Sequence, residues 1–554
     1  MMLKEFFIGS PSTGRCVQIN VSAAKTLQEL RSGIANAFSI LPKDSISFEN
    51  TQSQLSTLES IIKSNEPVQV RVDEHHVREP LGPKALPLVG NHYELYPDHV
   101  GNHERLFARY GPVIKTVNMG TTIYLTNDPN VSRYVLSETE YFTKTTTDPQ
   151  HPLHYMRDNT ALFTCDSDAP VFKVAHKFVP PSMSPKAVRH YSPIMQEAVE
   201  RSFKAFDELD RQDLAFNCYQ YMFKLAGQII YKMVLGMNLD HFENINSPPH
   251  EIIRLLGEYL ILMKKVSLRP QWYSYLPFGP PKRLAWVKDR IWKLVDQAIE
   301  QRPRAPDGDQ DLPLHDAALK ATCVADYLCR AIDEKGQKLS HEYMLSNCVV
   351  LVGAGFITSA SLLSWLIYAL VKYPGNQERL LQELVDHGAT ADTKWRYDTI
   401  QSMKFLDKFV KEVQRVHNPS FQTARNAKKD VVLPGGYLLP KGAVIIPTFP
   451  SLHMNEAYWD NPNKFDPDRW DSDAVKQRHK MVYTPFATGP RGCIGFNVAL
   501  QEAKLTLANL VYRYHWEDAS TEPMVYDPEF LVMRPLNFYA RAVQRTTWPQ
   551  KSHE

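Results

Sequence analysis

Alternating apolar and polar residues predict a small sheet with one long helix at the start of the chain. Residues at period two indicate strands over 3–8, 16–21, 46–48 and 68–72. Between the second and third strands, apolar residues recur at helical spacing: Leu27, Leu30, Ile34 and Phe38. Thr26 and Glu29 have the spacing of a capping box at the start of this helix. A short helical turn is expected over 58–62.

Helical patterns outnumber strand patterns from residue 100 onward. Apolar residues spaced three and four apart predict helices over 196–209, 215–235, 341–372, 376–386 and 404–416. Short strands are expected over 113–118, 122–126, 431–433 and 444–446. The expected fold class is therefore mainly α with minor β, preceded by a small α+β segment.

One stretch has the composition of a membrane helix. Between Tyr343 and Val371 the chain has no Asp, Glu, Lys or Arg, but Asn347 and several serines interrupt the apolar run. A helix that passes through the centre of a large domain is apolar on all sides for the same reason. We therefore expect a buried core helix and no transmembrane helix. The N-terminal residues MMLKEFFIGS also lack the apolar core of a signal peptide.

Charge and cysteine content narrow the class of protein. Of 554 residues, 22% are charged and the formal net charge is +2, so no nucleic-acid partner is expected. Seven cysteines are scattered without a CxxC pair and do not form a disulfide framework. This favours a reducing compartment and a cytoplasmic location. Peripheral association with a membrane stays open, because an apolar surface can form without a spanning helix.

The first segment resembles a ubiquitin-like β-grasp domain in its order of strands and helices. We expect this domain over 1–73, a proline-rich linker over 74–90 and a large domain over 91–545. The small domain is interpreted as a docking or solubility module with a protein partner of its own. The alternative is a packing extension of the large domain.

Residues 486–495, FATGPRGCIG, have the composition that a thiolate metal ligand needs. Backbone N–H groups directed at the sulfur stabilise a thiolate, and Gly489 and Gly495 allow the backbone to turn closely around Cys493. A helix that starts after Gly495 directs the positive end of its dipole at the same atom. Phe486 can pack beside the sulfur. A buried cysteine without a metal is the alternative interpretation.

This segment matches the haem-binding loop of the cytochrome P450 family, FxxGxRxCxG, at every fixed position. The chain resembles that family from about Gly90 to Arg545. The resemblance implies a cytochrome P450 fold with haem b, whose iron is bound by the Cys493 thiolate, a ligand that favours O–O cleavage. It also implies that Arg491 reaches a haem propionate.

Further motifs occur in the order of that family. Glu412 and Arg415 form ExxR, and Arg469 of FDPDRW is similar to the arginine that completes the family's buried charge network, a structural rather than catalytic feature. His176 stands where the family's WxxxR motif has arginine. The resemblance implies that His176 and Arg425 donate hydrogen bonds to a propionate. A surface histidine is the alternative for His176.

The expected core helix contains AGFITS over 354–359, which is similar to the family's AGx(D/E)T(T/S). The resemblance implies that Gly355 opens a groove for dioxygen and that Thr358 hydrogen-bonds the bound oxygen. Ile357 stands where the family has an acid. The side-chain proton relay is therefore missing at this position, and a water chain or another residue must replace it.

Four residues lie where family members line the distal pocket, and they indicate an apolar or aromatic substrate: Phe163, Phe356, Phe421 and Val532. The segment from Phe163 to His176 most resembles the soluble fatty-acid hydroxylases that carry a fused reductase. Two departures from those enzymes weaken the prediction of a fatty-acid substrate. No arginine near Tyr124 anchors a carboxylate, and the chain ends at Glu554 without a reductase. A separate diflavin reductase is therefore expected, with NADPH used only through it.

Three hypotheses for function follow. The leading one is a haem-thiolate monooxygenase that inserts one oxygen atom of O₂ into a hydrophobic small molecule. Ile357 motivates a second, a hydroperoxide isomerase or dehydratase that needs no reductase, although Thr358 argues against it. The third is a non-catalytic haem sensor or scaffold whose function belongs to the ubiquitin-like segment.

Overall fold

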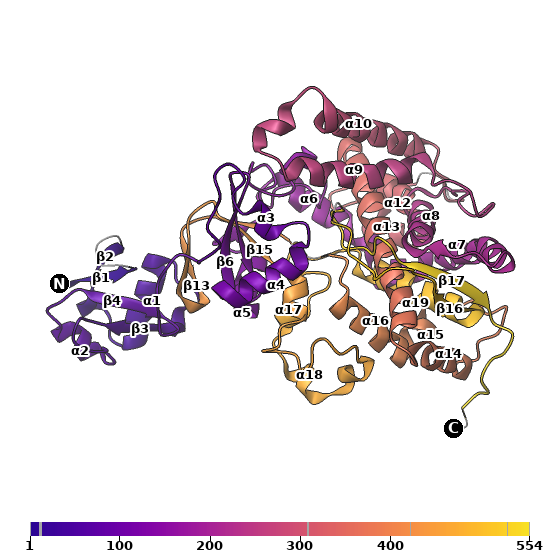
Figure 1. The fold of residues 1–554 in the computed structure, drawn as a ribbon. Coiled ribbons are helices and arrows are strands. Elements are labelled where there is room, and N and C mark those ends of the chain that lie inside the picture. Colours follow the sequence, from indigo (N-terminus) through magenta and orange to yellow (C-terminus); the bar gives the residue numbers. More distant parts are fainter. Residues whose placement is uncertain are drawn as a thin grey trace. The chain divides into compact units, whose positions relative to one another are not determined.

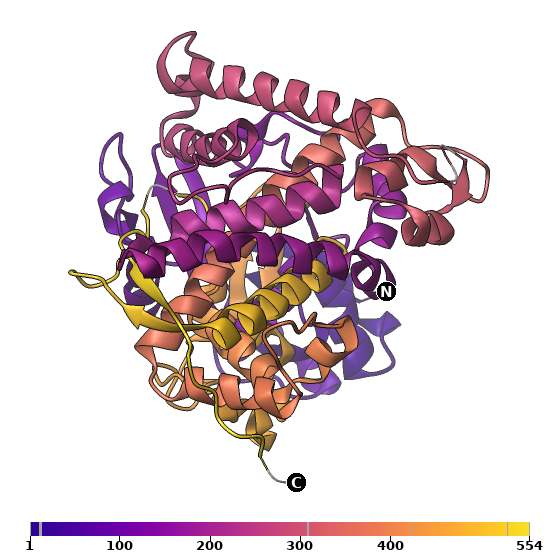
Figure 2. The ribbon, with the colours of Figure 1, turned by 90° about the vertical axis from the view of Figure 1, so that its right-hand side faces the viewer.

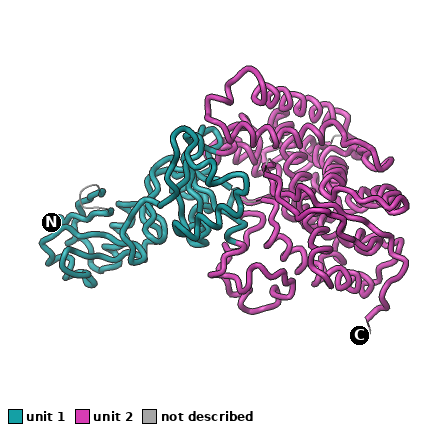
Figure 3. Tube along the Cα trace, viewed as in Figure 1, with its two compact units in different colours: residues 1–151, 422–452, 488–491 teal, residues 152–421, 453–487, 492–554 magenta. Residues whose placement is uncertain are grey.

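The computed structural model describes residues 2–9, 14–306, 308, 310–420, 423–528 and 530–552. The chain divides into two compact units (Figure 3). The smaller unit comprises residues 1–151, 422–452 and 488–491, and the larger comprises residues 152–421, 453–487 and 492–554. Each unit is described separately below.

The smaller unit begins with a mixed sheet covered by one helix (Figure 1). Its main strands pair in the order β2-β1-β4-β3, with β1 and β4 parallel. Their bounds are β1 (Leu3–Ile8), β2 (Arg15–Asn20), β3 (Ile46–Glu49) and β4 (Val68–Val72). The helices are α1 (Leu27–Phe38) and the short α2 (Leu58–Lys63). This small α+β domain is the one that the sequence pattern predicts, with each strand placed to within one residue.

The start of α1 differs in one detail from the predicted capping box. The hydroxyl of Thr26 accepts a hydrogen bond from the Glu29 N–H at 3.1 Å, as expected. The Glu29 carboxylate, however, accepts from the N–H of Lys25 at 2.7 Å instead of that of Thr26. The reciprocal half of the box is therefore displaced by one residue.

The small domain is bonded to a hairpin that comes from much later in the chain. This hairpin consists of β13 (Val431–Leu433) and β14 (Tyr437–Leu439). Val432 donates its N–H to the Ser39 carbonyl at 3.0 Å, and its own carbonyl accepts from the Leu41 N–H at 2.8 Å. Its side chain is fully buried in the same hydrophobic cluster as the core of the small sheet.

A second set of backbone hydrogen bonds holds the other strand of the hairpin. The Arg78 N–H donates to the Gly436 carbonyl at 2.9 Å, and the Arg78 carbonyl accepts from the Leu438 N–H at 2.8 Å. Asp73 also accepts a hydrogen bond from the Gly435 N–H at 2.8 Å. This placement favours the alternative in which the small domain is a packing extension rather than a separable docking module.

Replacing Val432 with alanine is expected to lower the free energy of unfolding by about 1–3 kcal/mol, because it removes buried methyl groups where the domain and the hairpin meet. Urea denaturation followed by circular dichroism measures the change. Val525→Ala is the control, since Val525 is an exposed valine. Equal stability of the two variants would contradict the shared core.

The remainder of the smaller unit is built on a five-stranded sheet with the order β6-β7-β15-β12-β8. Its strands are β6 (Val113–Asn118), β7 (Thr121–Thr126), β15 (Val444–Pro447), β12 (Arg425–Ala427) and β8 (Phe142–Thr143). Two helices of eight or more residues accompany this sheet among the described residues of the unit, α4 (His99–Tyr110) and α5 (Pro129–Leu136).

The larger unit is mainly helical. Its long helices are α6 (Pro170–Phe178), α7 (Pro185–Arg211), α8 (Cys218–Leu235), α9 (Glu251–Ser267), α10 (Gly279–Glu300), α13 (His341–Lys372), α14 (Asn376–Asp386), α16 (Lys404–Val416) and α19 (Phe496–Arg513). Helix α13 packs against both α8 and α19, and α7 packs against the same two helices (Figures 1 and 2). The unit also contains a small sheet of β16 (Tyr514–Asp518), β17 (Tyr539–Gln544) and β9 (Phe216–Asn217).

Helix α13 is the apolar stretch singled out in the sequence. Among the described residues it is the one helix long and apolar enough to cross a membrane, with a mean hydropathy of 1.9 over its most apolar window. Of that window, 67% is buried inside the protein. This matches the expected core helix, because neighbouring helices cover its surface.

Candidate active site

Cys493 lies in a loop that leads directly into α19. The Cys493 N–H donates to the Phe486 carbonyl at 2.9 Å, which closes the loop on itself. The side chain is accessible to solvent yet surrounded closely by protein, and this desolvation raises the pKa of the thiol. A hydrogen bond from the Gly495 N–H lowers the same pKa. Gly495 is also the N-cap of α19, so the helix presents its positive end to the sulfur.

The two glycines of the loop have different roles. Gly489 has a φ of 75°, and a Cβ there would collide with the Leu136 carbonyl oxygen, so no other residue fits. An added Cβ at Gly495 would meet the Cys493 Sγ at 3.9 Å, which is an ordinary contact. The structure therefore shows a steric need for glycine at position 489, whereas Gly495 acts on the sulfur through its N–H group.

One face of α13 is accessible although most of the helix is buried. The face consists of residues at helical spacing: Leu351, Ala354, Gly355 and Thr358. The Thr358 hydroxyl donates to the Ala354 carbonyl at 2.8 Å. Since its hydrogen is engaged within the helix, the lone pairs of this oxygen are available to accept a hydrogen bond from a ligand.

A small hydrophobic cluster joins this face to the thiolate loop. Leu162, Ala175 and Val179 form its centre. Leu351 of α13 and Ile494, the residue after Cys493, both pack against it. The accessible face of α13 and the loop of Cys493 therefore converge within the larger unit.

Two predicted residues of α13, Gly355 and Phe356, lie close to side chains of α8. An added Cβ at Gly355 would meet the Ile230 side chain of α8 at 3.2 Å, so this glycine allows α8 and α13 to pack closely. Phe356 is fully buried, and its ring lies 5.0 Å from that of Phe223 on α8. That placement corrects the prediction that Phe356 lines a pocket, because its side chain belongs to the helix–helix core.

The other predicted pocket residues differ in exposure. Phe163 is 44% exposed, and Val532 is partly buried against the main core. Beside Val532, the Met533 carbonyl accepts a hydrogen bond from the Trp365 Nε1 of α13 at 3.0 Å, which fixes this segment on the helix. Phe421 lies outside the described residues.

The basic side chains that were predicted to bind the haem propionates are divided between the two units. Arg425 is buried on β12 in an ion pair with Glu138, and burial lowers the pKa of its guanidinium to about 10. The charge of Arg491 acts on Arg425 in the same direction, so the two arginines lie near each other in the smaller unit. In the larger unit, His176 is exposed on α6 with its ring 5.3 Å from that of Phe172.

Glu412, Arg415 and Arg469 form one charge network. Two nitrogens of Arg415 donate to the Glu412 carboxylate at 2.9 and 3.0 Å, and the Arg469 Nε donates to the same group at 2.9 Å. The Trp470 Nε1 and the Asp466 N–H complete the set at 3.1 and 2.9 Å. Glu412 and Arg415 are fully buried, and five donors satisfy the carboxylate.

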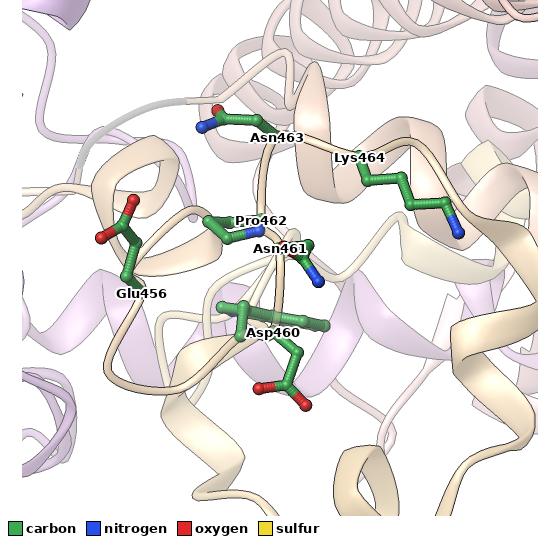
Figure 4. Close-up of a pocket in the computed structure, with 7 residues that line it drawn as sticks. Glu456, Asp460, Asn461, Pro462, Asn463 and Lys464 are labelled. Carbon is green, nitrogen blue, oxygen red and sulfur yellow. The ribbon is translucent and has the colours of Figure 1, made fainter.

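Both arginines also fix a long loop by its carbonyl groups. Arg415 and Arg469 each donate to the Lys464 carbonyl, at 3.2 and 2.6 Å, and Arg469 donates to the Asp460 carbonyl at 2.9 Å. The outer side of this loop has a shallow pocket lined by Glu456, Trp459, Asp460, Asn461, Pro462, Asn463 and Lys464 (Figure 4). The labelled charged side chains point in different directions, so the pocket assembles no catalytic group.

Comparison with known proteins identifies the family. Residues 80–541 match the family model for cytochrome P450. The chain belongs to the cytochrome P450 family. It is 52% identical over 553 residues to cytochrome P450 monooxygenase alnD from Emericella nidulans, which covers 100% of both chains. It is 34% identical over 285 residues to human cytochrome P450 4F2, which covers 50% of this chain and 54% of that one.

The fold agrees with this assignment. The crystal structure of the cytochrome P450DA haem domain superposes with a TM-score of 0.74 at 22% identity, covering 85% of this chain and 98% of the other. The chain is therefore a cytochrome P450 monooxygenase, and the family implies a haem iron bound by a cysteine thiolate. The residues of the larger unit fit that group, because they provide an accessible thiol and apolar neighbours for a flat macrocycle.

Glu502 is a buried acid that the sequence analysis missed. It lies on α19, where its Oε2 accepts a hydrogen bond from the Ser359 hydroxyl of α13 at 2.9 Å. Its second oxygen, Oε1, is buried and has no hydrogen-bond partner among the residues that the structure describes. Burial raises the pKa of Glu502 to about 8, and the bond from Ser359 lowers it by less. Glu502 is therefore largely protonated at neutral pH.

This raised pKa predicts a pH-dependent stability. Between about pH 5 and pH 8 folded Glu502 keeps a proton that the unfolded chain releases, so stability falls as the pH rises. Glu502→Gln removes this pH dependence. The free energy of unfolding of the variant minus that of the parent should therefore rise by up to about 1.4 kcal/mol for each pH unit across the window. Thermal unfolding over this range measures it, with exposed Glu517→Gln as control. A pH-independent difference would contradict the buried proton.

Proposed function

We propose that this chain is a haem-thiolate monooxygenase in which the Cys493 thiolate would bind the haem iron. The observation that carries the proposal is the convergence of the Cys493 loop and the accessible face of α13 on one hydrophobic cluster. Cys493 would hold the iron of a haem bound there, and Thr358 lies on the accessible face of α13. The reaction inserts one oxygen atom of O₂ into a hydrophobic small molecule.

The haem, when bound, supplies the activation of dioxygen and the oxidation of the C–H bond. The protein residues prepare that chemistry. The Gly495 N–H and the start of α19 would stabilise the negative charge of Cys493 when its sulfur binds the iron. Arg425 and Arg491 in the smaller unit and His176 in the larger unit are the cations that would bind propionates, and Thr358 would accept and pass on a hydrogen bond from a ligand.

The remaining parts of the proposal concern partners and location. A separate diflavin reductase supplies electrons from NADPH. The protein is placed in the cytoplasm, in peripheral contact with membranes. The domains are assigned as 1–73, the linker 74–90 and 91–545. The small domain contacts the β13–β14 hairpin in addition to any protein partner that it binds.

Incubation with reductase, NADPH and ¹⁸O₂ tests the reaction, since a monooxygenase must place labelled oxygen in its product.

A hydroperoxide isomerase or dehydratase is the second candidate, and Ile357 is the observation that favours it. Ile357 is buried and provides no proton. Such an enzyme would convert a lipid hydroperoxide without NADPH and without incorporating ¹⁸O₂. Turnover under those conditions, together with no product from the reductase system, would replace the monooxygenase proposal.

Removing the Thr358 hydroxyl should separate NADPH consumption from product formation. In Thr358→Ala we expect product formation to fall by about 10²-fold, because a positioned hydrogen-bonding group for proton transfer is lost. NADPH oxidation should fall less. Thr358→Ser keeps the hydroxyl and should retain most of the product yield. The measurement is the ratio of product to NADPH consumed, and an unchanged ratio in the alanine variant would exclude this role.

A further inference from the structure

Two consecutive residues of the small domain join its core to that of the five-stranded sheet. Ile40 and Leu41 follow α1, and both are buried. Ile40 packs in the core of the small domain together with Val432. Leu41 packs in a different hydrophobic cluster, which contains Ala427 of β12 and Phe142 of β8. The small domain is therefore in direct contact with the core of the sheet to which β12 belongs.

Charged and backbone groups make a second connection beside the first. Arg15 on β2 forms an ion pair with Asp430, which lies between β12 and β13. The other carboxylate oxygen of Asp430 accepts a hydrogen bond from the Lys441 N–H. Nearer to β12, the Lys428 N–H donates to the Tyr141 carbonyl at 2.8 Å. The segment that follows β12 is thus held by the small domain and by the residues before β8.

Strand β12 begins with Arg425, whose guanidinium is only partly satisfied. Its Nη1 donates to the Thr423 hydroxyl and to the Ala424 carbonyl, each at 2.9 Å. Its Nε is paired with Glu138. Its Nη2 is buried and has no hydrogen-bond partner among the residues that the structure describes. A buried donor without a partner is costly, so an acceptor such as a carboxylate is expected to complete the set.

We propose that the small domain positions Arg425 for a haem propionate and so slows the dissociation of haem. This role rests on the proposed function, in which Arg425 would bind a propionate. Leu41 and Arg15 are the positioning residues, because they hold the sheet and the segment that follows Arg425. A guanidinium that is already fixed forms its hydrogen bonds without a further entropic cost of ordering. The small domain then has a function within its own chain that needs no external partner.

Transfer of haem from the purified full-length protein to excess apomyoglobin tests this role, because its rate measures haem dissociation rather than turnover. Leu41→Ala should lose haem about tenfold faster than the parent, since the cavity loosens the sheet that contains β12. Leu41→Met nearly conserves the volume and should lose haem at close to the parent rate. Arg15→Glu, an exposed substitution, should accelerate the loss about threefold, because it places a like charge beside Asp430.

Leu209→Ala is the matched control, because Leu209 is similarly buried on α7 of the larger unit. Urea denaturation should show losses of stability that are similar for Leu209→Ala and Leu41→Ala, whereas only Leu41→Ala should lose haem faster. Equal rates of haem loss in these two variants would overturn the positioning role. An unchanged rate in Arg15→Glu would also count against it.

The dependence on Arg425 has a test of its own. Arg425→Lys keeps the charge but lacks the planar fork, so haem loss should already be fast, and adding Leu41→Ala should accelerate it by less than about twofold. A full tenfold acceleration in that background would show that the small domain does not act through Arg425. Parent protein that binds no haem would instead refute the proposed function, which keeps the two failures distinct.

Discussion

Replacing Cys493 with serine is expected to abolish NADPH-dependent product formation. The hydroxyl of serine does not become an anionic ligand at neutral pH, so the iron would lose the donor that favours O–O cleavage. The hydrogen bond from Gly495 and the dipole of α19 would then act on a neutral group. Haem content and turnover of the purified variant measure the effect, and we expect turnover at background.

Cys16→Ser is the control for this experiment. Cys16 is an exposed cysteine on β2 of the small domain, so its loss should leave haem content and turnover unchanged. If Cys493→Ser kept the turnover of the parent, the assignment of the ligand would be wrong.

Replacing Arg415 with alanine is expected to lower the free energy of unfolding by about 3–5 kcal/mol, because the Glu412 carboxylate would stay buried with its main counter-charge removed. The carbonyls of His453 and Lys464 would also each lose a hydrogen bond that Arg415 donates at 3.2 Å. Urea denaturation measures the loss. Arg415→Lys should restore only part of it, since lysine cannot form the two parallel hydrogen bonds.

An exposed ion pair in the same unit provides the matched comparison. Arg379 donates two hydrogen bonds to Asp468, each at 2.9 Å, which is similar geometry in a solvated place. Arg379→Ala should therefore cost no more than about 1 kcal/mol. Equal losses in the two alanine variants would show that burial of the Glu412 network contributes nothing to stability.

Local sequence patterns predicted the elements whose signals are local. The apolar run of α13, bounded by Ser340 and Lys372, predicted both ends of that helix correctly. The alternation in β1 and β4 likewise places both strands. In contrast, α9 and α10 were not predicted, because Lys264 and Lys265 interrupt the apolar pattern of α9. Pro280 and Pro281 resemble a loop, although proline is well tolerated in the first turn of a helix.

Long-range contacts account for what the sequence did not reveal. The Glu502 position has the pattern of an ordinary helical glutamate, and only the packing of α19 against α13 buries it. The bond between Val432 and Ser39 joins segments almost 400 residues apart. The ligand loop was predictable because ten consecutive residues carry its chemistry. The surroundings of Phe356 depend on α8, which no local motif specifies.

The most direct test of the thiolate assignment is the carbon monoxide difference spectrum of the purified haem protein. One sample is reduced by a diflavin reductase with NADPH and the other by dithionite. A strongly red-shifted Soret band in both samples, absent in Cys493→Ser, is the result expected of a thiolate-bound iron that accepts electrons from a flavoprotein. A parent protein that shows no such band with either reductant would contradict Cys493 as the ligand.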